Sequence, residues 1–151
     1  MTKITAVQVK KLREATGAGI LAVKKALEEA KGDESKARQI LNKKGLEKMA
    51  KRGDKEAREG QVYAYTHAGG SVAGMVKINC ETDFVAKSED FVQLAKELAM
   101  QVASMNPKDI KDLLAQKNIR DTSKTVKELV DEVATRVKEK VIVSKIARMS
   151  L

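Results

Sequence analysis

The fold is decided by residues 61–79, which read QVYAYTHAGGSVAGMVKIN. Two β-prone runs, residues 61–67 and 71–79, flank Ala68-Gly69-Gly70, and a glycine-containing loop between such runs is typical of a β-hairpin. Residues of the second run fall into two alternating sets: Val72, Gly74, Val76 and Ile78 against Ala73, Met75 and Lys77. This alternation indicates a sheet that is covered on one face only.

The residues before the hairpin repeat with helical spacing. Residues 5–44 predict three short helices, with Thr5 and Asp33 as caps and with stops at residues 16–19, at Gly32 and at Gly45. We therefore expect a three-helix bundle over residues 1–45 and a solvated helical connector over residues 46–60, which hold few large apolar side chains.

The residues after the hairpin predict helices and one more strand. Ser88 is the expected cap of a helix that runs to Pro107, and Thr125 to Glu128 has the spacing of a capping box at the start of another. Residues 141–146 are rich in β-branched residues and predict a third strand. The fold class is α+β, with an antiparallel sheet and flanking helices over residues 61–151.

Composition limits the chemistry of the chain. Among 151 residues there is one Cys and one His, so no intramolecular disulfide and no metal site of Cys and His ligands can form. No phosphate-binding glycine loop is present. His67 lies beside a turn at the end of a predicted strand, where we do not expect a general base. We expect no catalysis, no cofactor and no metal.

The cell compartment can be predicted from the same counts. No apolar run approaches the roughly 20 residues of a membrane span. The first five residues lead directly into an amphipathic pattern and lack the apolar core of a signal peptide. Together with the single cysteine, these features predict a cytoplasmic protein that does not enter a membrane.

Positive charge is concentrated in the first third of the chain. Of the net charge of +9, residues 1–53 supply most, with 14 Lys and Arg against 6 Asp and Glu. Such a field favours an acidic protein partner or the phosphates of nucleic acid. No aromatic residue lies in this segment to stack on bases, so specific nucleic-acid recognition is not expected, although a basic RNA- or ribosome-associated module remains the alternative.

One conspicuous feature remains, the stretch Thr82-Asp83-Phe84-Val85 between the hairpin and the next helix. Thr82 and Asp83 favour a turn, which would direct Phe84 outward, whereas a position in the core is also open to Phe84. A loop fixed on a rigid hairpin and helix is a suitable place for a binding tip. From the residues alone, we infer a binding module with a Phe-bearing tip.

Several motifs resemble those of the elongation factor Ts family. Residues 12–27 (LREATGAGILAVKKAL) resemble the opening motif of that family, and residues 65–70 and 79–87 (NCETDFVAK) resemble its central hairpin and tip. Gly32-Asp33, residues 44–46, residues 99–103 and residues 121–126 (DTSKTV) continue the resemblance in the same order over almost the whole chain.

The resemblance implies a function and a set of contacts. Members of the family bind elongation factor Tu in its GDP form and promote GDP release, so this chain would be a guanine-nucleotide exchange factor without covalent chemistry. A bundle similar to ubiquitin-associated domains would dock on the GTPase through Ile20, Leu21, Lys24 and Lys25. The tip Thr82, Asp83, Phe84 and Val85 would enter beside the nucleotide and dislodge the Mg²⁺ ion of the partner.

Two departures from the family pattern bear on assembly. The region after Met105-Asn106-Pro107 is shorter than in typical members, and Ser144, Lys145 and Ile146 stand where the family has two arginines and an aromatic residue. A shortened core leads to the hypothesis that two chains pair as a homodimer through the exposed edge of the sheet.

Overall fold

The computed structural model describes residues 4–53 and 55–151, and the chain divides into two compact units, residues 1–54 and 55–151. The first three residues of the expected bundle and Asp54 of the expected connector lie outside the described ranges. Helices fill the first unit, and helices with an antiparallel sheet make up the second, so the α+β class is confirmed. Within the described ranges, no helix combines the length and the hydrophobicity needed to cross a membrane.

The first unit is a bundle of α1 (Ala6–Thr16), α2 (Ile20–Glu29) and α3 (Glu34–Ala50). Thr5 forms a capping box with Gln8 at the start of α1, and the Asp33 carboxylate caps α3, as the sequence predicted. Gly17 ends α1 in the left-handed conformation. The buried side chains of the bundle are Val9, Leu12, Val23, Ala26, Leu27, Ala30, Ala37 and Leu41.

The expected stop at Gly45 is wrong, because α3 continues through it to Ala50. One glycine costs about 1 kcal/mol in a helix interior, and the good helix formers on both sides of Gly45 offset that cost. The expectation of a separate helical connector over residues 46–60 is also wrong, because residues 46–50 belong to α3. Residues 55–58 are not helical, and β1 begins at Glu59.

The second unit is built on a sheet of three antiparallel strands in the order β1-β2-β3. The predicted hairpin joins β1 (Glu59–Thr66) to β2 (Val72–Cys80) through the 3-10 turn η1 (Ala68–Gly70). The predicted third strand is β3 (Ile142–Ser150), which pairs with β2 across a register shift at Lys77/Ile78.

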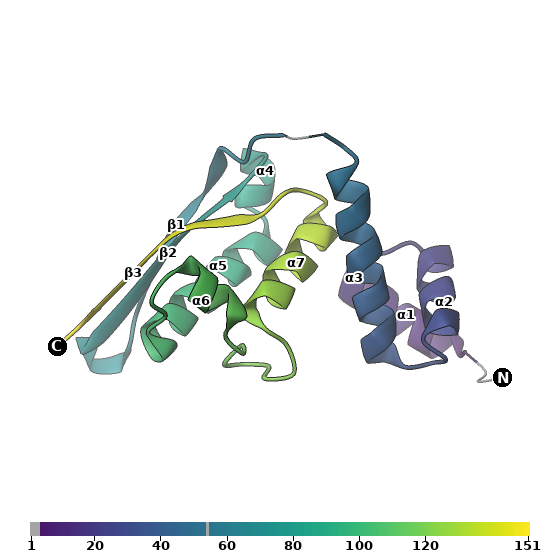
Figure 1. Cartoon of the computed structure of the whole chain (residues 1–151), viewed down its shortest axis with the longest axis horizontal. Coiled ribbons are helices and arrows are strands. Elements are labelled where there is room, and N and C mark those ends of the chain that lie inside the picture. Colours follow the sequence, from purple (N-terminus) through teal and green to yellow (C-terminus); the bar gives the residue numbers. More distant parts are fainter. Residues whose placement is uncertain (1–3, 54) are drawn as a thin grey trace. The chain divides into compact units, whose positions relative to one another are not determined.

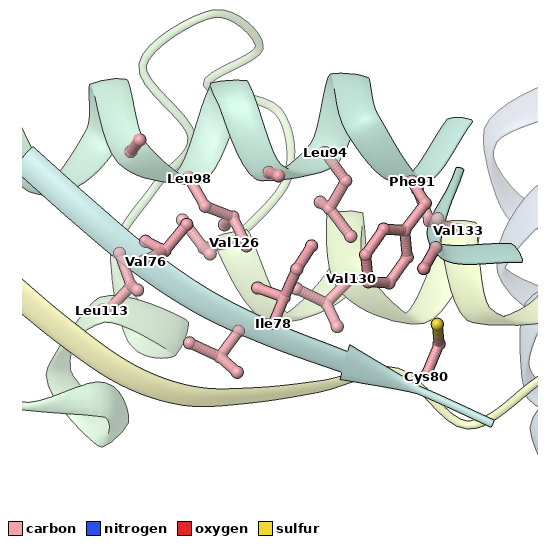
Figure 2. Close-up of a cluster of buried hydrophobic side chains, with 14 of the residues drawn as sticks. Val76, Ile78, Cys80, Phe91, Leu94, Leu98, Leu113, Val126, Val130 and Val133 are labelled. Carbon is pink, nitrogen blue, oxygen red and sulfur yellow. The ribbon is translucent and has the colours of Figure 1, made fainter. Parts of the chain in front are cut away.

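Helices cover one face of this sheet (Figure 1). They are α4 (Asp83–Ala86), α5 (Glu89–Met105), α6 (Ile110–Ala115) and α7 (Val126–Val137). Figure 2 shows Phe91, Leu94 and Leu98 of α5 facing Val76 and Ile78 of β2. The core therefore lies between the central strand and α5, as the predicted alternation requires.

Gly74 shows how closely α5 approaches the sheet. A Cβ atom on Gly74 would lie 2.4 Å from the carbonyl oxygen of Ala99 and 2.6 Å from the amide nitrogen of Ala103. No side chain fits at these distances, so glycine is required where the helix backbone lies on β2. This contact fixes the distance between the sheet and the helix that follows the tip.

Candidate functional site

The predicted tip is a single turn of helix. Thr82 is the N-cap of α4, and its hydroxyl oxygen accepts a hydrogen bond from the Val85 amide at 3.3 Å. The sequence predicted a turn here. The hydroxyl cap and four following residues without Gly or Pro convert that turn into α4, which ends at Ala86, with Lys87 as its C-cap before the next N-cap, Ser88.

The side chains of the tip face in two directions. Phe84 is 81% exposed, whereas Val85 and Ala86 are 6% and 4% exposed and pack into the core of the second unit. Successive helical residues are rotated by about 100°, so a core-facing Val85 leaves Phe84 directed into solvent. Thr82, Asp83 and Phe84 are thus the accessible part of the predicted tip, and Val85 anchors it.

Three parts of the chain support the tip from behind. Glu139, between α7 and β3, accepts hydrogen bonds from the amides of Glu81 and Thr82 at 3.1 and 3.0 Å. The Gln61 side-chain amide of β1 donates to the Ala86 carbonyl at 2.7 Å, and the Cys80 thiol donates to the Thr82 carbonyl at 3.2 Å. The tip is therefore braced by the sheet and by the connection from α7.

Asp83 carries the charge of the tip. Its carboxylate accepts a hydrogen bond from Lys87 Nζ at 2.9 Å, with both side chains mostly exposed. This hydrogen bond and the positive charge of Lys87 lower the pKa of Asp83 below its ordinary value, so the carboxylate is ionised at neutral pH. Water screens such a surface pair, and a partner can replace Lys87 at little cost.

The predicted docking residues lie on α2 of the first unit. Ile20 and Leu21 are 48% and 76% exposed, and Lys24 and Lys25 are also exposed. A groove of about 1000 Å³ runs along α1 and α2, and Ile20 and Lys24 line it together with Val9, Arg13 and Gly17. Leu21 and Lys25 follow Ile20 and Lys24 in the sequence and form the next exposed row of side chains on α2. The four residues thus make one apolar and basic surface.

Sequence reasoning missed two of the residues that brace the tip. Gln61 was assigned only to a strand, and Glu139 received no role. No local pattern could have indicated Glu139, because it lies 57 residues from Thr82 along the chain. Gln61 is a polar residue among apolar neighbours of β1, which is a weak signal for a side-chain role.

The first unit is a basic helical bundle, and the second exposes an aromatic residue on a braced helical turn; such features are typical of the class of binding proteins. A family model described as elongation factor TS matches residues 81–151. Elongation factor Ts of Syntrophobacter fumaroxidans is 38% identical to this chain over 194 positions, which cover 99% of the chain and 97% of the relative. The chain belongs to the elongation factor Ts family, a family of protein biosynthesis.

Other relatives carry the same name. Elongation factor Ts of Moorella thermoacetica is 38% identical over 190 positions, covering 96% of this chain and 94% of the relative. That of Oleidesulfovibrio alaskensis is 52% identical over 107 positions, which cover 71% of this chain and 54% of the relative.

The alignment lengths agree with a shortened chain. The alignment to the Syntrophobacter protein has 194 positions and this chain has 151 residues, so at least 43 positions face a gap here. The expectation that the missing segment follows Met105-Asn106-Pro107 stays a prediction.

Proposed function

We propose that this chain promotes the release of GDP from elongation factor Tu in translation elongation, so that GTP can take the empty site. The observation that carries the proposal is Phe84, 81% exposed on a braced helical turn, in a chain of the elongation factor Ts family. The chain acts by binding, without covalent chemistry and without a cofactor of its own, and it works in the cytoplasm, where elongation takes place.

The mechanism divides the work between the two units. Ile20 and Leu21 supply apolar contact area on the GTPase, and Lys24 and Lys25 speed the encounter with an acidic surface. Likeness of this bundle to ubiquitin-associated domains belongs to the same proposal. The bundle docks on the GTPase, and the tip of the second unit acts beside the nucleotide.

At the nucleotide site, Asp83 and Phe84 displace the elements of elongation factor Tu that hold its Mg²⁺ ion. A bound divalent cation is the largest local charge in such a site, so its loss weakens the hold on GDP. The factor then binds the nucleotide-free GTPase better than the GDP form. Because this coupling is reciprocal, binding of the factor lowers the affinity for GDP by the same ratio.

A stopped-flow measurement of labelled GDP leaving elongation factor Tu tests the proposal. Micromolar chain is expected to accelerate release strongly over the spontaneous rate. Release at the spontaneous rate would overturn the proposal. If the same chain then bound RNA with a steep salt dependence, the alternative of an RNA- or ribosome-associated module would be supported.

The docking surface has a test of its own. Replacing Lys24 and Lys25 by Glu should slow association about tenfold at low salt, and the difference should shrink as salt screens the charges. Lys43→Glu with Lys48→Glu, on exposed positions of α3, is the control with the same change of charge. Equal association rates for the two double variants would show that Lys24 and Lys25 only solvate the bundle.

Pairing of two chains is a further part of the proposal. The face of the sheet opposite the helices carries exposed Val62, Met75 and Met149, and at least 43 aligned positions of a relative are missing here. We extend the expected contact from the sheet edge to this face. Light scattering should give the mass of a dimer for the wild-type chain and that of a monomer for Met75→Glu. If the wild-type chain is a monomer both alone and with elongation factor Tu, the proposed pairing is wrong.

A further inference from the structure

Glu139 occupies the short connection between α7 and β3, which passes beside α4 (Figure 1). Its carboxylate makes three hydrogen bonds to the residues that begin the tip. One oxygen accepts from the amides of Glu81 and Thr82 at 3.1 and 3.0 Å. The other accepts from the Thr82 hydroxyl at 2.7 Å.

The third of these bonds orients the cap of α4. A threonine hydroxyl has one proton to donate, and Thr82 donates it to Glu139. The oxygen is then left to accept, and it accepts from the Val85 amide, which starts the helical turn. Glu139 therefore acts on α4 through Thr82, and hydrogen bonds to an ionised acceptor are the stronger kind.

The contact is reciprocal. The Glu81 carboxylate accepts a hydrogen bond from the Lys140 amide at 2.9 Å. Residues 81–82 and 139–140 thus form a clasp, in which each segment binds backbone amides of the other. Lys138 ends α7 in the left-handed conformation, with φ 60°, and this turn brings Glu139 to the tip.

The clasp connects the tip to rigid parts of the core. Val130 and Val133 of α7 belong to the same buried cluster as Phe91 of α5, and β3 pairs with the central strand. Behind the tip, Val85 is anchored in that cluster. Without Glu139, Val85 would still hold α4 to the core, but the residues leading into the turn would lose three of their hydrogen bonds.

We propose that Glu139 is a positioning residue: through Thr82 and the amides of residues 81 and 82, it fixes the direction in which Phe84 enters the partner. The proposal rests on the proposed function, in which Phe84 acts beside the nucleotide site. In the proposed function, docking rests on Ile20, Leu21, Lys24 and Lys25 of α2, whereas displacement of the partner's elements needs Phe84 in one place. Loss of the clasp should therefore lower the maximal rate of GDP release more than it weakens docking.

The test compares Glu139→Ala and Glu139→Gln with the wild-type chain. Glu47→Ala is the matched control, because Glu47 is exposed on α3 and its loss makes the same change of charge. Amide hydrogen exchange at Glu81 and Thr82 is measured by NMR on the chain alone. Loss of a charged acceptor should speed exchange at both amides about tenfold or more in Glu139→Ala, less in Glu139→Gln, and not in the control.

The second measurement is GDP release from elongation factor Tu as a function of factor concentration. In Glu139→Ala, the maximal rate should fall about tenfold, while the half-saturating concentration changes less than about twofold. A maximal rate equal to that of the wild-type chain would overturn the proposal. So would a rise in half-saturating concentration alone, because Glu139 would then be part of the docking contact.

The two measurements separate the possible failures. Wild-type exchange rates at Glu81 and Thr82 in Glu139→Ala would show that Glu139 does not protect these two amides. This result, obtained on the chain alone, would overturn the proposal. A wild-type chain that leaves GDP release unchanged would overturn the proposed function, and the role of Glu139 toward a partner would fall with it. If Glu139→Ala does not fold, the same two measurements on Glu139→Gln test the proposal, because the glutamine side chain has the same size as that of glutamate.

Discussion

The two phenylalanines of this chain lie seven residues apart and have opposite environments. Phe91 is fully buried at the start of α5, whereas Phe84 is 81% exposed in α4 (Figure 2 shows Phe91). Each lies just after a helix N-cap that carries a hydroxyl group: Phe84 after Thr82, and Phe91 after Ser88. Each hydroxyl oxygen accepts a hydrogen bond from the backbone amide three residues later. In α5 the residue three positions after the cap is Phe91 itself, whereas in α4 it is Val85, the residue after Phe84.

The comparison shows that the cap sets the direction of each side chain. The third position after the cap faces the core in both helices, where Val85 and Phe91 are buried. The second position is half-buried in α5 and exposed in α4. In α5 it holds Asp90, which pairs with Arg136, and in α4 it holds Phe84. An aromatic residue at a position suited to a charge contributes little to folding, which is why we assign Phe84 to binding.

The largest effect should come from the buried member of the pair. Phe91→Ala leaves a cavity between α5 and the sheet, and should lower the free energy of unfolding by about 3–5 kcal/mol. Urea denaturation followed by circular dichroism measures it. Phe91→Leu is the control, with a smaller loss expected. A loss below about 1 kcal/mol for the alanine variant would show that the site collapses to fill the space.

The exposed member should give the opposite result. Phe84→Ala should change the free energy of unfolding by less than about 0.5 kcal/mol, because the ring makes no core contact. GDP release from elongation factor Tu should slow about 30-fold or more, as for the loss of a central anchor residue. Asp83→Asn tests the charge beside it under the same conditions. If Phe84→Ala unfolds the chain, the ring is part of the core.

The cap of α4 should give an intermediate effect. Thr82→Ala removes the acceptor for the Val85 amide and the donor to Glu139, and should lower the free energy of unfolding by about 1 kcal/mol. Thr82→Ser keeps the hydroxyl and should recover most of this loss. Thermal denaturation measures both variants. Equal stability of Thr82→Ala and the wild-type chain would mean that the cap is not needed to form α4.

The last prediction concerns an effect that is absent at neutral pH and develops only in alkaline solution. Burial, and after it the carboxylate of Glu139, raises the pKa of the Cys80 thiol from 9.0 to about 11. The folded chain therefore keeps this proton after the unfolded chain has lost it. The stability that the neutral thiol contributes is present below pH 9.0 and is lost as the pH rises from there to about 11.

Cys80→Ser is the control for this prediction, because serine keeps a donor to the Thr82 carbonyl and does not titrate in this range. Every other ionisable group is common to both proteins, so only the difference between the two unfolding curves reports on Cys80. Parallel curves from pH 8 to pH 11 would contradict the raised pKa.

Local patterns were enough to predict much of this fold. The alternation around Val76 predicted the covered face of β2, and the spacing from Ser88 and from Thr125 predicted the starts of α5 and α7. The stop at Gly45 failed because a single-residue preference is outweighed by the helix formers around it. Exposure of Phe84 stayed open in the sequence, because turn and core positions were both compatible with it.

The sequence by itself determined the class of the fold, the two units and the residues of the tip. These follow from short-range physics, since periodicity, caps and glycine turns act over a few residues. Tertiary structure alone decided that Val85 anchors the tip, that Phe84 points into solvent and that Glu139 accepts hydrogen bonds from Glu81 and Thr82. Those contacts join residues up to 58 positions apart, and no local preference encodes which distant acceptor will meet a given amide.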